Sequence, residues 1–277
     1  LWYFGKDLPD YKELSKYNPN VVTRIHAGNG ALLAEYAMQK RVFVPISVIP
    51  KKVINAFISA EDKDFYNHFG IDLRATLRAL VTNIKNFGTG KRLIGASTIT
   101  QQVAKNFLLS SELSYERKIK EAILAIRIER AFSKNEILEL YLNEIYLGFR
   151  SYGVAAAALN YFDKSLDNLD LSETAFLAAL PKAPNNYNPI HKKKQAIMRR
   201  NWVLAQMLKN GLIREETKEI ESKKLINLRK SSGIDEGYAP YFTEEVRKIL
   251  MKNKKIGSKL YTNGYSVRTT LDPFIQL

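Results

Sequence analysis

Two carboxylates stand on helix faces that would ordinarily carry other residues. Glu61 follows Ile54 and Phe57 at helical spacing, so an acid continues an apolar stripe. Partial desolvation on such a face raises the pKa of a carboxyl group and suits it to accept a proton near neutral pH. Glu121 lies one turn beyond Arg117, so a carboxylate and a cation share one row of a second helix. The face of that helix expected in the core carries Ile119, Ala122, Ile123 and Ile126.

The segment between the two acids is rich in hydroxyl and amide side chains. Residues 95–106 read Gly-Ala-Ser-Thr-Ile-Thr-Gln-Gln-Val-Ala-Lys-Asn. These donors and the single cation suit sugar hydroxyls or phosphate oxygens. One hydroxyl could cap the helix that follows, but capping leaves the two glutamines and Lys105 unexplained. Without this segment, the spacing of Arg117 and Glu121 would fit an exposed, solvated ion pair equally well.

Five short boxes in a fixed order resemble the signature motifs of the family-51 glycosyltransferases, the peptidoglycan polymerases. They are Glu-Asp-x-x-Phe-x-x-His-x-Gly from Glu61, Gly-Ala-Ser-Thr-Ile-Thr-Gln-Gln from Gly95, Arg-Lys-x-x-Glu from Arg117, residues 135–143 and residues 199–204. Residues 41–50 resemble the approach to the first box, and residues 264–272 resemble the strand that leads into a transpeptidase domain. The whole chain is similar to the amino-terminal half of the bifunctional class A penicillin-binding proteins of the 1A type.

The resemblance implies roles for single residues. Glu61 matches the family's base. Glu121 matches its second essential carboxylate, which would orient cations or a divalent metal, Mg²⁺ or Mn²⁺, at a diphosphate. In the last box, Arg199 or Arg200 is expected at the donor phosphates and Trp202 in the core. The substrate-binding positions, of which the first two are expected mainly to support Glu61, are Asp62, His68, Ser97, Thr98, Gln102, Lys105, Asn106, Arg117 and Lys118.

The resemblance also implies a reaction and a fold. The donor is a glycan strand on undecaprenyl diphosphate, and the acceptor is lipid II, whose 4-hydroxyl attacks the donor's anomeric carbon. The lipid diphosphate leaves, and the new link is β-1,4. Lipid II, the lipid-linked glycan strand and moenomycin-type inhibitors are the expected partners. The implied fold is mainly α, with a lysozyme-like helical lobe, a smaller membrane-proximal jaw and short β elements at both ends.

The pattern along the chain divides it into three regions, and the resemblance implies what each one is. Residues 1–50 are a juxtamembrane extended region with a hairpin at Gly28-Asn29-Gly30. Residues 51–228 are the helical glycosyltransferase domain, and residues 229–277 are a linker and first strand toward a transpeptidase domain.

Local signals within the helical region predict where single elements begin and end. Capping boxes at Ser133 and Asp170 open helices that Gly148 and Pro181 are expected to end. An alanine-rich helix over residues 153–159 is expected to be buried, and residues 181–189 form a loop of the kind that rims a cleft.

Composition restricts the chemistry further. The chain has no cysteine, which excludes thiol catalysis and a disulfide scaffold, and its three histidines are too scattered for a metal cluster. The net charge of +15 suits nucleic acid, an anionic membrane surface or a diphosphate. Because the charges are dispersed and not interleaved with aromatics, no nucleic-acid partner is expected.

Two segments indicate a membrane surface, although no apolar run reaches the ~20 residues of a span. The aromatic start at residues 1–4 is interpreted as the outer end of a single-pass anchor, with an ordinary frayed terminus as the alternative. The resemblance places such an anchor in the bacterial cytoplasmic (inner) membrane and the active domain on the periplasmic face. Residues 86–95 are interpreted as a flap that guides a lipid chain, with Lys91 and Arg92 at headgroup depth, or as a flexible linker.

Two other enzyme classes fit the sequence less well. A lysozyme-like glycoside hydrolase also uses two carboxylates, but its leaving group is a sugar and needs no cluster of cations. Penicillin binding needs a Ser-x-x-Lys nucleophile and a Lys-Thr-Gly partner, and neither occurs in the chain. We therefore expect no reaction with β-lactams.

Overall fold

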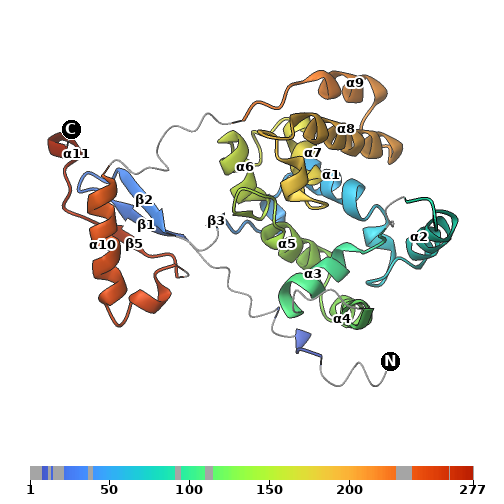
Figure 1. Cartoon of the computed structure of the whole chain (residues 1–277), viewed down its shortest axis with the longest axis horizontal. Helices are drawn as coiled ribbons and strands as arrows, with labels where there is room; N and C mark the ends of the chain where they lie inside the picture. Colours follow the sequence, from blue (N-terminus) through green and yellow to red (C-terminus); the bar gives the residue numbers. More distant parts are fainter. Residues whose placement is uncertain are drawn as a thin grey trace.

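The molecule consists of a helical body and a small sheet with one helix packed against it (Figure 1). The structure is a computed structural model, and it describes residues 8–11, 14, 22–36, 40–90, 95–109, 115–228, 239–261 and 263–276. The mainly α fold predicted from the sequence is confirmed. Residues 1–7 and 91–94, which hold the proposed anchor end and the cationic part of the proposed flap, lie outside the described residues.

The helical body is built around α1, which packs against α7 and α8, while α3 packs against α4 and α5. Its apolar centre is one continuous cluster that includes Phe57, Leu138 and Phe176. The helices of the body are α1 (Lys51–Glu61), α2 (Leu73–Lys85), α3 (Ile99–Leu108), α4 (Tyr115–Ala131), α5 (Lys134–Glu144), α6 (Val154–Phe162), α7 (Leu171–Ala179), α8 (Lys193–Lys209) and α9 (Glu215–Lys223).

Three helices of the body begin at capping boxes, in which a side chain and the backbone satisfy each other's free groups. Ser133 opens α5 and Asp170 opens α7, as predicted, and Thr98 opens α3 in the same way. Helix α7 ends before Pro181, also as predicted. The prediction that α5 runs to Gly148 is wrong, because the chain becomes extended at Ile145 and the glycine lies in the turn beyond.

The alanine-rich helix α6 is buried, as its composition predicts. Gly153, immediately before it, has a φ of +81°, and a Cβ there would lie 2.6 Å from the carbonyl oxygen of Asn143. The side chain of Asn143 in turn exchanges hydrogen bonds with the backbone of Val44, at 2.8 Å and 2.9 Å. This contact ties the segment before α1 to the end of α5 and gives Asn143 a structural role.

The predicted core face of α4 is wrong. Ile119 and Ile126 are 38% and 37% exposed, whereas Leu124 and Ile128 are fully buried. Glu121 lies on the same face as these two buried residues. The apolar pattern misled because this helix carries hydrophobic residues on two faces, and only tertiary packing decides which face is covered.

The two ends of the described chain form one small unit, whereas the sequence predicted two separate terminal regions. Strand β1 (Thr23–His26) pairs antiparallel with β2 (Leu32–Tyr36) through the predicted hairpin, and parallel with β5 (Ser266–Arg268). Helices α10 (Pro240–Lys252) and α11 (Pro273–Gln276) complete this part of the chain. Side chains from α10 pack against the buried residues of β1 and β2, so the unit has an apolar cluster of its own.

A short parallel pair, β3 (Lys40–Arg41) and β4 (Ser151–Tyr152), connects the segment after this sheet to the helical body. Arg41 pairs with Glu144 and lies over the ring of Tyr152, 4.9 Å from its centroid. These contacts hold the segment before α1 against the body. Helix α1, which ends at Glu61, itself packs on α7 and α8.

Candidate active site

A cleft of about 690 Å³ opens where the end of α1, the start of α3, α4 and α8 meet. Its volume lies within the range usual for ligand sites. The polar and aromatic residues that line this cleft are Glu61, Ser97, Gln101, Gln102, Lys105, Lys118, Glu121, Lys182, Tyr187, Arg199 and Trp202.

Glu61 is the last residue of α1 and carries the desolvated carboxylate predicted from the sequence. Burial raises the pKa of Glu61, and this cause outweighs a hydrogen bond from Gln102 and the charges of Arg199, Lys182 and Lys105, all of which lower it. The amide of Gln102 donates to Oε2 of Glu61 at 3.0 Å. This contact orients the carboxylate within the cleft, as a general base requires.

Glu121 is almost fully buried, at 1% exposure, and lies between two cations. Its Oε1 lies 3.0 Å from Nε of Arg117 and its Oε2 lies 2.6 Å from Nζ of Lys118. Lys118 also donates to Oγ of Ser97 at 3.1 Å. An exposed and solvated ion pair, the alternative left open by the spacing, is therefore wrong.

Cations outnumber carboxylates in the cleft. Lys105, Lys118, Lys182 and Arg199 line it together with Glu61 and Glu121. Burial lowers the pKa of Lys105, and the charge of Glu121 opposes that shift. An excess of positive charge in a partly desolvated cleft suits an anionic group such as a diphosphate.

Asp62, His68 and Thr98 hold the first two boxes together and do not line the cleft. Asp62 accepts a hydrogen bond from the backbone N–H of Ile99 at 2.9 Å, and Nε2 of His68 lies 3.0 Å from its Oδ2. The hydroxyl of Thr98 donates to the carbonyl of Gly70 at 2.6 Å and accepts from the amide of the third helical residue. These contacts hold the end of α1 against the start of α3, and Thr98 also caps α3. Asp62 and Thr98 line a second, smaller pocket on the other side of Glu61.

Two further substrate-binding candidates are placed differently from the expectation. Asn106 is exposed on α3 and is not among the residues that line the cleft. Arg117 is also outside the lining and borders the cleft through its pair with Glu121. Ser97, Gln102, Lys105 and Lys118 do line it.

The two arginines of the last box, Arg199 and Arg200, have different roles. Arg200 is fully buried and donates to Oγ of Ser172 and to the backbone carbonyls of Ser222 and Lys224, which makes it structural. Arg199 lines the cleft. Trp202, predicted in the core, is 39% exposed and also lines the cleft, so that prediction is wrong.

The sequence reasoning missed Lys182 and Tyr187. Both belong to the loop over residues 181–189, which was predicted to rim a cleft and does so. The sequence did carry a signal for Lys182, which lies between Pro181 and Pro184 directly after a helix. The two prolines restrict the loop, so the position of this cation beside the helix end is held.

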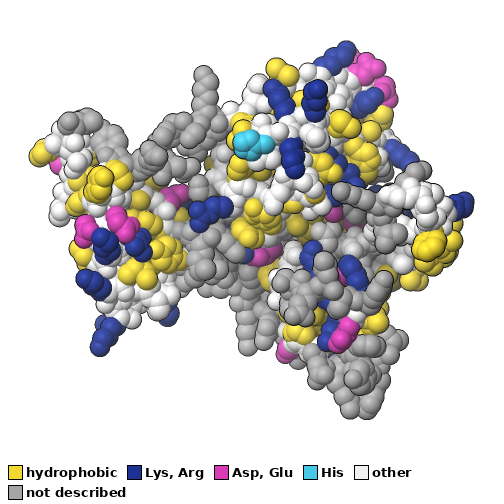
Figure 2. Space-filling view, in the orientation of Figure 1, with side chains coloured by type: hydrophobic (Ala, Val, Ile, Leu, Met, Phe, Trp, Pro, Cys, Tyr) yellow, Lys and Arg dark blue, Asp and Glu magenta, His cyan; other side chains and the backbone are white. Residues whose placement is uncertain are grey.

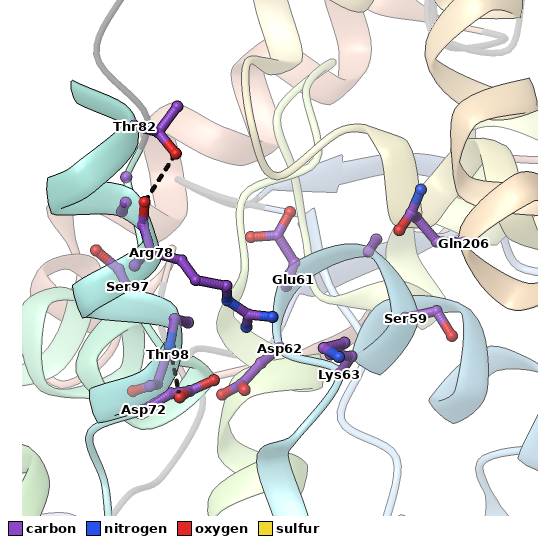
Figure 3. A pocket seen from close by; sticks show the side chains of 15 residues that line it. Ser59, Glu61, Asp62, Lys63, Asp72, Arg78, Thr82, Ser97, Thr98 and Gln206 are labelled. Atoms are coloured by element: carbon purple, nitrogen blue, oxygen red, sulfur yellow. Dashed lines mark hydrogen bonds between the residues drawn. The ribbon is translucent and has the colours of Figure 1, made fainter. Parts of the chain in front are cut away.

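A second, smaller pocket of about 300 Å³ meets the cleft at Glu61. It lies between α1, α2 and the start of α3, and Figure 3 shows Arg78 of α2 extending across it toward Glu61 and Asp62. Ala60, Glu61, Gly95 and Ser97 line both pockets. Glu61 therefore stands at the junction of the two spaces, and the charged residues of the smaller one are Glu61, Asp62, Lys63, Asp72 and Arg78.

The residues around Glu121 do not form a ligand set for a divalent cation. The part of the chain that the structure describes holds no group of three or more acidic or histidine side chains that could bind a metal ion. Both oxygens of Glu121 already face cations, which would repel a metal placed between them.

Comparisons with known proteins agree with one another. A transglycosylase family model matches residues 29–208. The chain is 47% identical to penicillin-binding protein 1A of Rickettsia bellii over 276 residues and 42% identical to that of Escherichia coli over 274 residues. These alignments cover 100% and 99% of the chain but 35% and 32% of those proteins, so the chain spans about a third of their length. The crystal structure of penicillin-binding protein 1A from Haemophilus influenzae matches 93% of this chain and 28% of its own, with a TM-score of 0.56 and 30% identity.

Proposed function

The chain belongs to the transglycosylase family, and on that premise we propose that it polymerises lipid II into β-1,4-linked glycan strands, with inversion and release of undecaprenyl diphosphate. The observation that carries this proposal is the position of Glu61. A desolvated acid lies at the junction of two pockets, and the larger one surrounds a buried carboxylate with cations.

In the proposed reaction, the two pockets hold the two substrates. The cationic cleft takes the lipid diphosphate of the donor, whose oxygens Lys105, Lys118, Lys182 and Arg199 can bind. The smaller pocket takes the acceptor sugar. Glu61 removes the proton of the acceptor 4-hydroxyl as that oxygen bonds to the anomeric carbon. The bond to the diphosphate breaks at the same carbon, and the cations stabilise the charge that collects on the phosphate.

A lysozyme-like hydrolase is the alternative function, and the site does not favour it. Hydrolysis of a glycan would use Glu61 and Glu121 as acid and base, but Glu121 is closed in by Arg117 and Lys118. A hydrolase also has no use for the remaining cations of the cleft, because its leaving group carries no charge.

The test is turnover of purified lipid II by the chain. We expect glycan strands and free undecaprenyl diphosphate, and no shortening of preformed glycan. Glycan shortening without use of lipid II would reverse the choice between the two functions.

Further partners follow from the same chemistry. Moenomycin-type phosphoglycolipids carry a phosphate, sugars and a lipid tail, and we propose that they occupy the cationic cleft in place of the donor. We propose that Mg²⁺ or Mn²⁺ enters with the substrate diphosphate, whose oxygens supply its ligands, because the described residues offer no ligand set of their own. We propose no nucleic-acid partner.

A membrane surface is the proposed location, in line with a lipid-linked substrate. Helix α2 has no buried residue, and its exposed apolar side chains gather on the part of the molecule that α2 occupies in Figure 1 (Figure 2). The stripe consists of Leu73, Leu77, Leu80, Val81 and Ile84, with Phe87 just beyond the helix. No helix among the described residues is long and apolar enough to cross a membrane. We propose that α2 rests in the interface of the periplasmic side of the bacterial inner membrane.

Replacing Leu77 and Ile84 together by serine is expected to weaken binding to anionic phospholipid vesicles by at least about ten-fold, because two apolar side chains leave the interface. Vesicle flotation at fixed ionic strength measures the change. The matched control replaces Ile220 and Leu225, which are 55% and 64% exposed away from α2. Equal losses in the two double variants would show that α2 has no special place at the membrane.

A further inference from the structure

An arginine and a tryptophan are stacked in the wall of the cleft. The guanidinium carbon of Arg199 lies 3.7 Å from the ring centroid of Trp202. The two residues are three positions apart on α8, so they lie on one face of that helix. Arg199 is 9% exposed and Trp202 is 39% exposed, so the indole lies on the solvent side of the guanidinium.

Arg199 has hydrogen-bonding capacity left for a ligand. Its Nε is buried and has no hydrogen-bond partner among the residues that the structure describes. Its flat face is occupied by the indole, which leaves the N–H edges of the guanidinium for the cleft. An arginine in this position presents a fork of donors to phosphate oxygens.

Arg199 also acts on Glu61 across the cleft. The charge of Arg199 opposes the rise in the pKa of Glu61 that burial causes, and the charge of Glu61 acts in turn on Arg199. Gln102 and Lys105 from α3, Lys182 from the loop after α7 and Tyr141 from α5 also act on Glu61. The other charged residues that line its two pockets are Lys118 and Glu121 in the cleft and Asp62, Lys63, Asp72 and Arg78 in the smaller pocket.

We propose that Trp202 is a positioning residue, whose indole holds the guanidinium of Arg199 against the cleft so that it faces both Glu61 and the donor diphosphate. The inference rests on the proposed function of the cleft. An arginine side chain has many rotamers, and stacking on an aromatic face removes most of them. Without the indole, Arg199 can turn toward solvent, and the cleft loses a fixed cation.

The test compares Trp202→Leu with Trp202→Phe. Leucine keeps an apolar side chain but removes the aromatic face, whereas phenylalanine keeps a face on which the guanidinium can stack. We expect Trp202→Leu to lower kcat/KM on lipid II by about three- to thirty-fold at neutral pH, and phenylalanine to restore most of it. Met198→Leu, at a site that is 71% exposed on the same helix, is the control and should change nothing.

The pH profile separates positioning from a merely structural role. Glu61 must be ionised to act as base, and a neighbouring cation lowers its pKa. When Arg199 is no longer held, the pKa of Glu61 rises, so the acidic limb of kcat/KM moves to higher pH in Trp202→Leu and not in Trp202→Phe. A loss of rate with an unmoved limb would overturn the inference.

Two further measurements complete the test. Adding Trp202→Leu to Arg199→Gln should cause no further loss, because the tryptophan acts through the arginine, and an additive loss would contradict this. Binding of inorganic pyrophosphate, followed by calorimetry, needs no turnover. We expect it to weaken in Trp202→Leu, and equal binding in wild type and variant would overturn the inference. If Trp202→Leu binds pyrophosphate more weakly than wild type, but wild type does not use lipid II, the proposed function is refuted and the positioning role of Trp202 stands.

Discussion

Glu61→Gln is expected to reduce polymerisation of lipid II by about a thousand-fold or more while the fold is kept. The amide has the shape of the carboxyl group but cannot take the proton of the attacking hydroxyl, and general base catalysis contributes roughly 10²–10⁴-fold. The wild-type rate should rise as pH increases through the pKa of Glu61, which burial places above its usual value. That acidic limb should be missing from the residual activity of the variant.

Stability provides the control for this prediction. The folded state raises the pKa of Glu61 above its value in the unfolded chain, so folding favours the protonated form. Its contribution to stability is therefore present at low pH and is lost as pH rises through the folded pKa. A neutral glutamine avoids that loss, and the melting temperature at neutral pH should not fall. Asp64→Asn, three residues on in an exposed pair with Lys63, should keep the rate. Near wild-type polymerisation by Glu61→Gln would refute the assignment of Glu61 as base.

The fold was predictable from the sequence where local signals decide it. Capping boxes at Ser133 and Asp170 place two helix starts, and the Gly28–Gly30 turn places the hairpin. The pairing of β5 with β1 was missed, because it joins residues more than 200 positions apart and no local pattern specifies it. The prediction of which face of α4 is buried was wrong for a related reason. Two faces of this helix are apolar, and only contacts with other helices determine which one is covered.

The site was predictable in its carboxylates and less so in its cations. Glu61 stands out because an acid continues an apolar stripe, and Glu121 because it shares a helical row with Arg117. Lys182 did not stand out, since a lysine in a loop is usually solvated. Trp202 was assigned to the core because large aromatics are mostly buried, and its stack on Arg199 depends on which way α8 is turned. Spacing shows which residues share a face but not whether that face meets a cleft.

Glu121→Gln is expected to reduce kcat/KM on lipid II by on the order of a hundred- to a thousand-fold, the range seen when one preorganised electrostatic group is removed. The buried carboxylate holds Arg117 at 3.0 Å and Lys118 at 2.6 Å. A neutral amide cannot hold both cations, so their charges are no longer fixed beside the departing diphosphate. Turnover of lipid II at fixed ionic strength measures the loss. A rate within a few-fold of wild type would show that the pair serves stability alone.

Loss of folding has to be separated from loss of chemistry in this variant, because removing one partner of a buried ion pair costs about 3–5 kcal/mol. The double variant Arg117→Gln/Glu121→Gln removes both charges and should recover much of that stability without recovering activity. Glu116→Gln, in an exposed pair with Lys120 on the same helix, should leave both unchanged. Titration of Mg²⁺ into Glu121→Gln then distinguishes two roles of the carboxylate. A rate that responds to the metal indicates that Glu121 acts by arranging positive charge at the diphosphate. A rate that does not respond indicates that its oxygens bind the substrate directly.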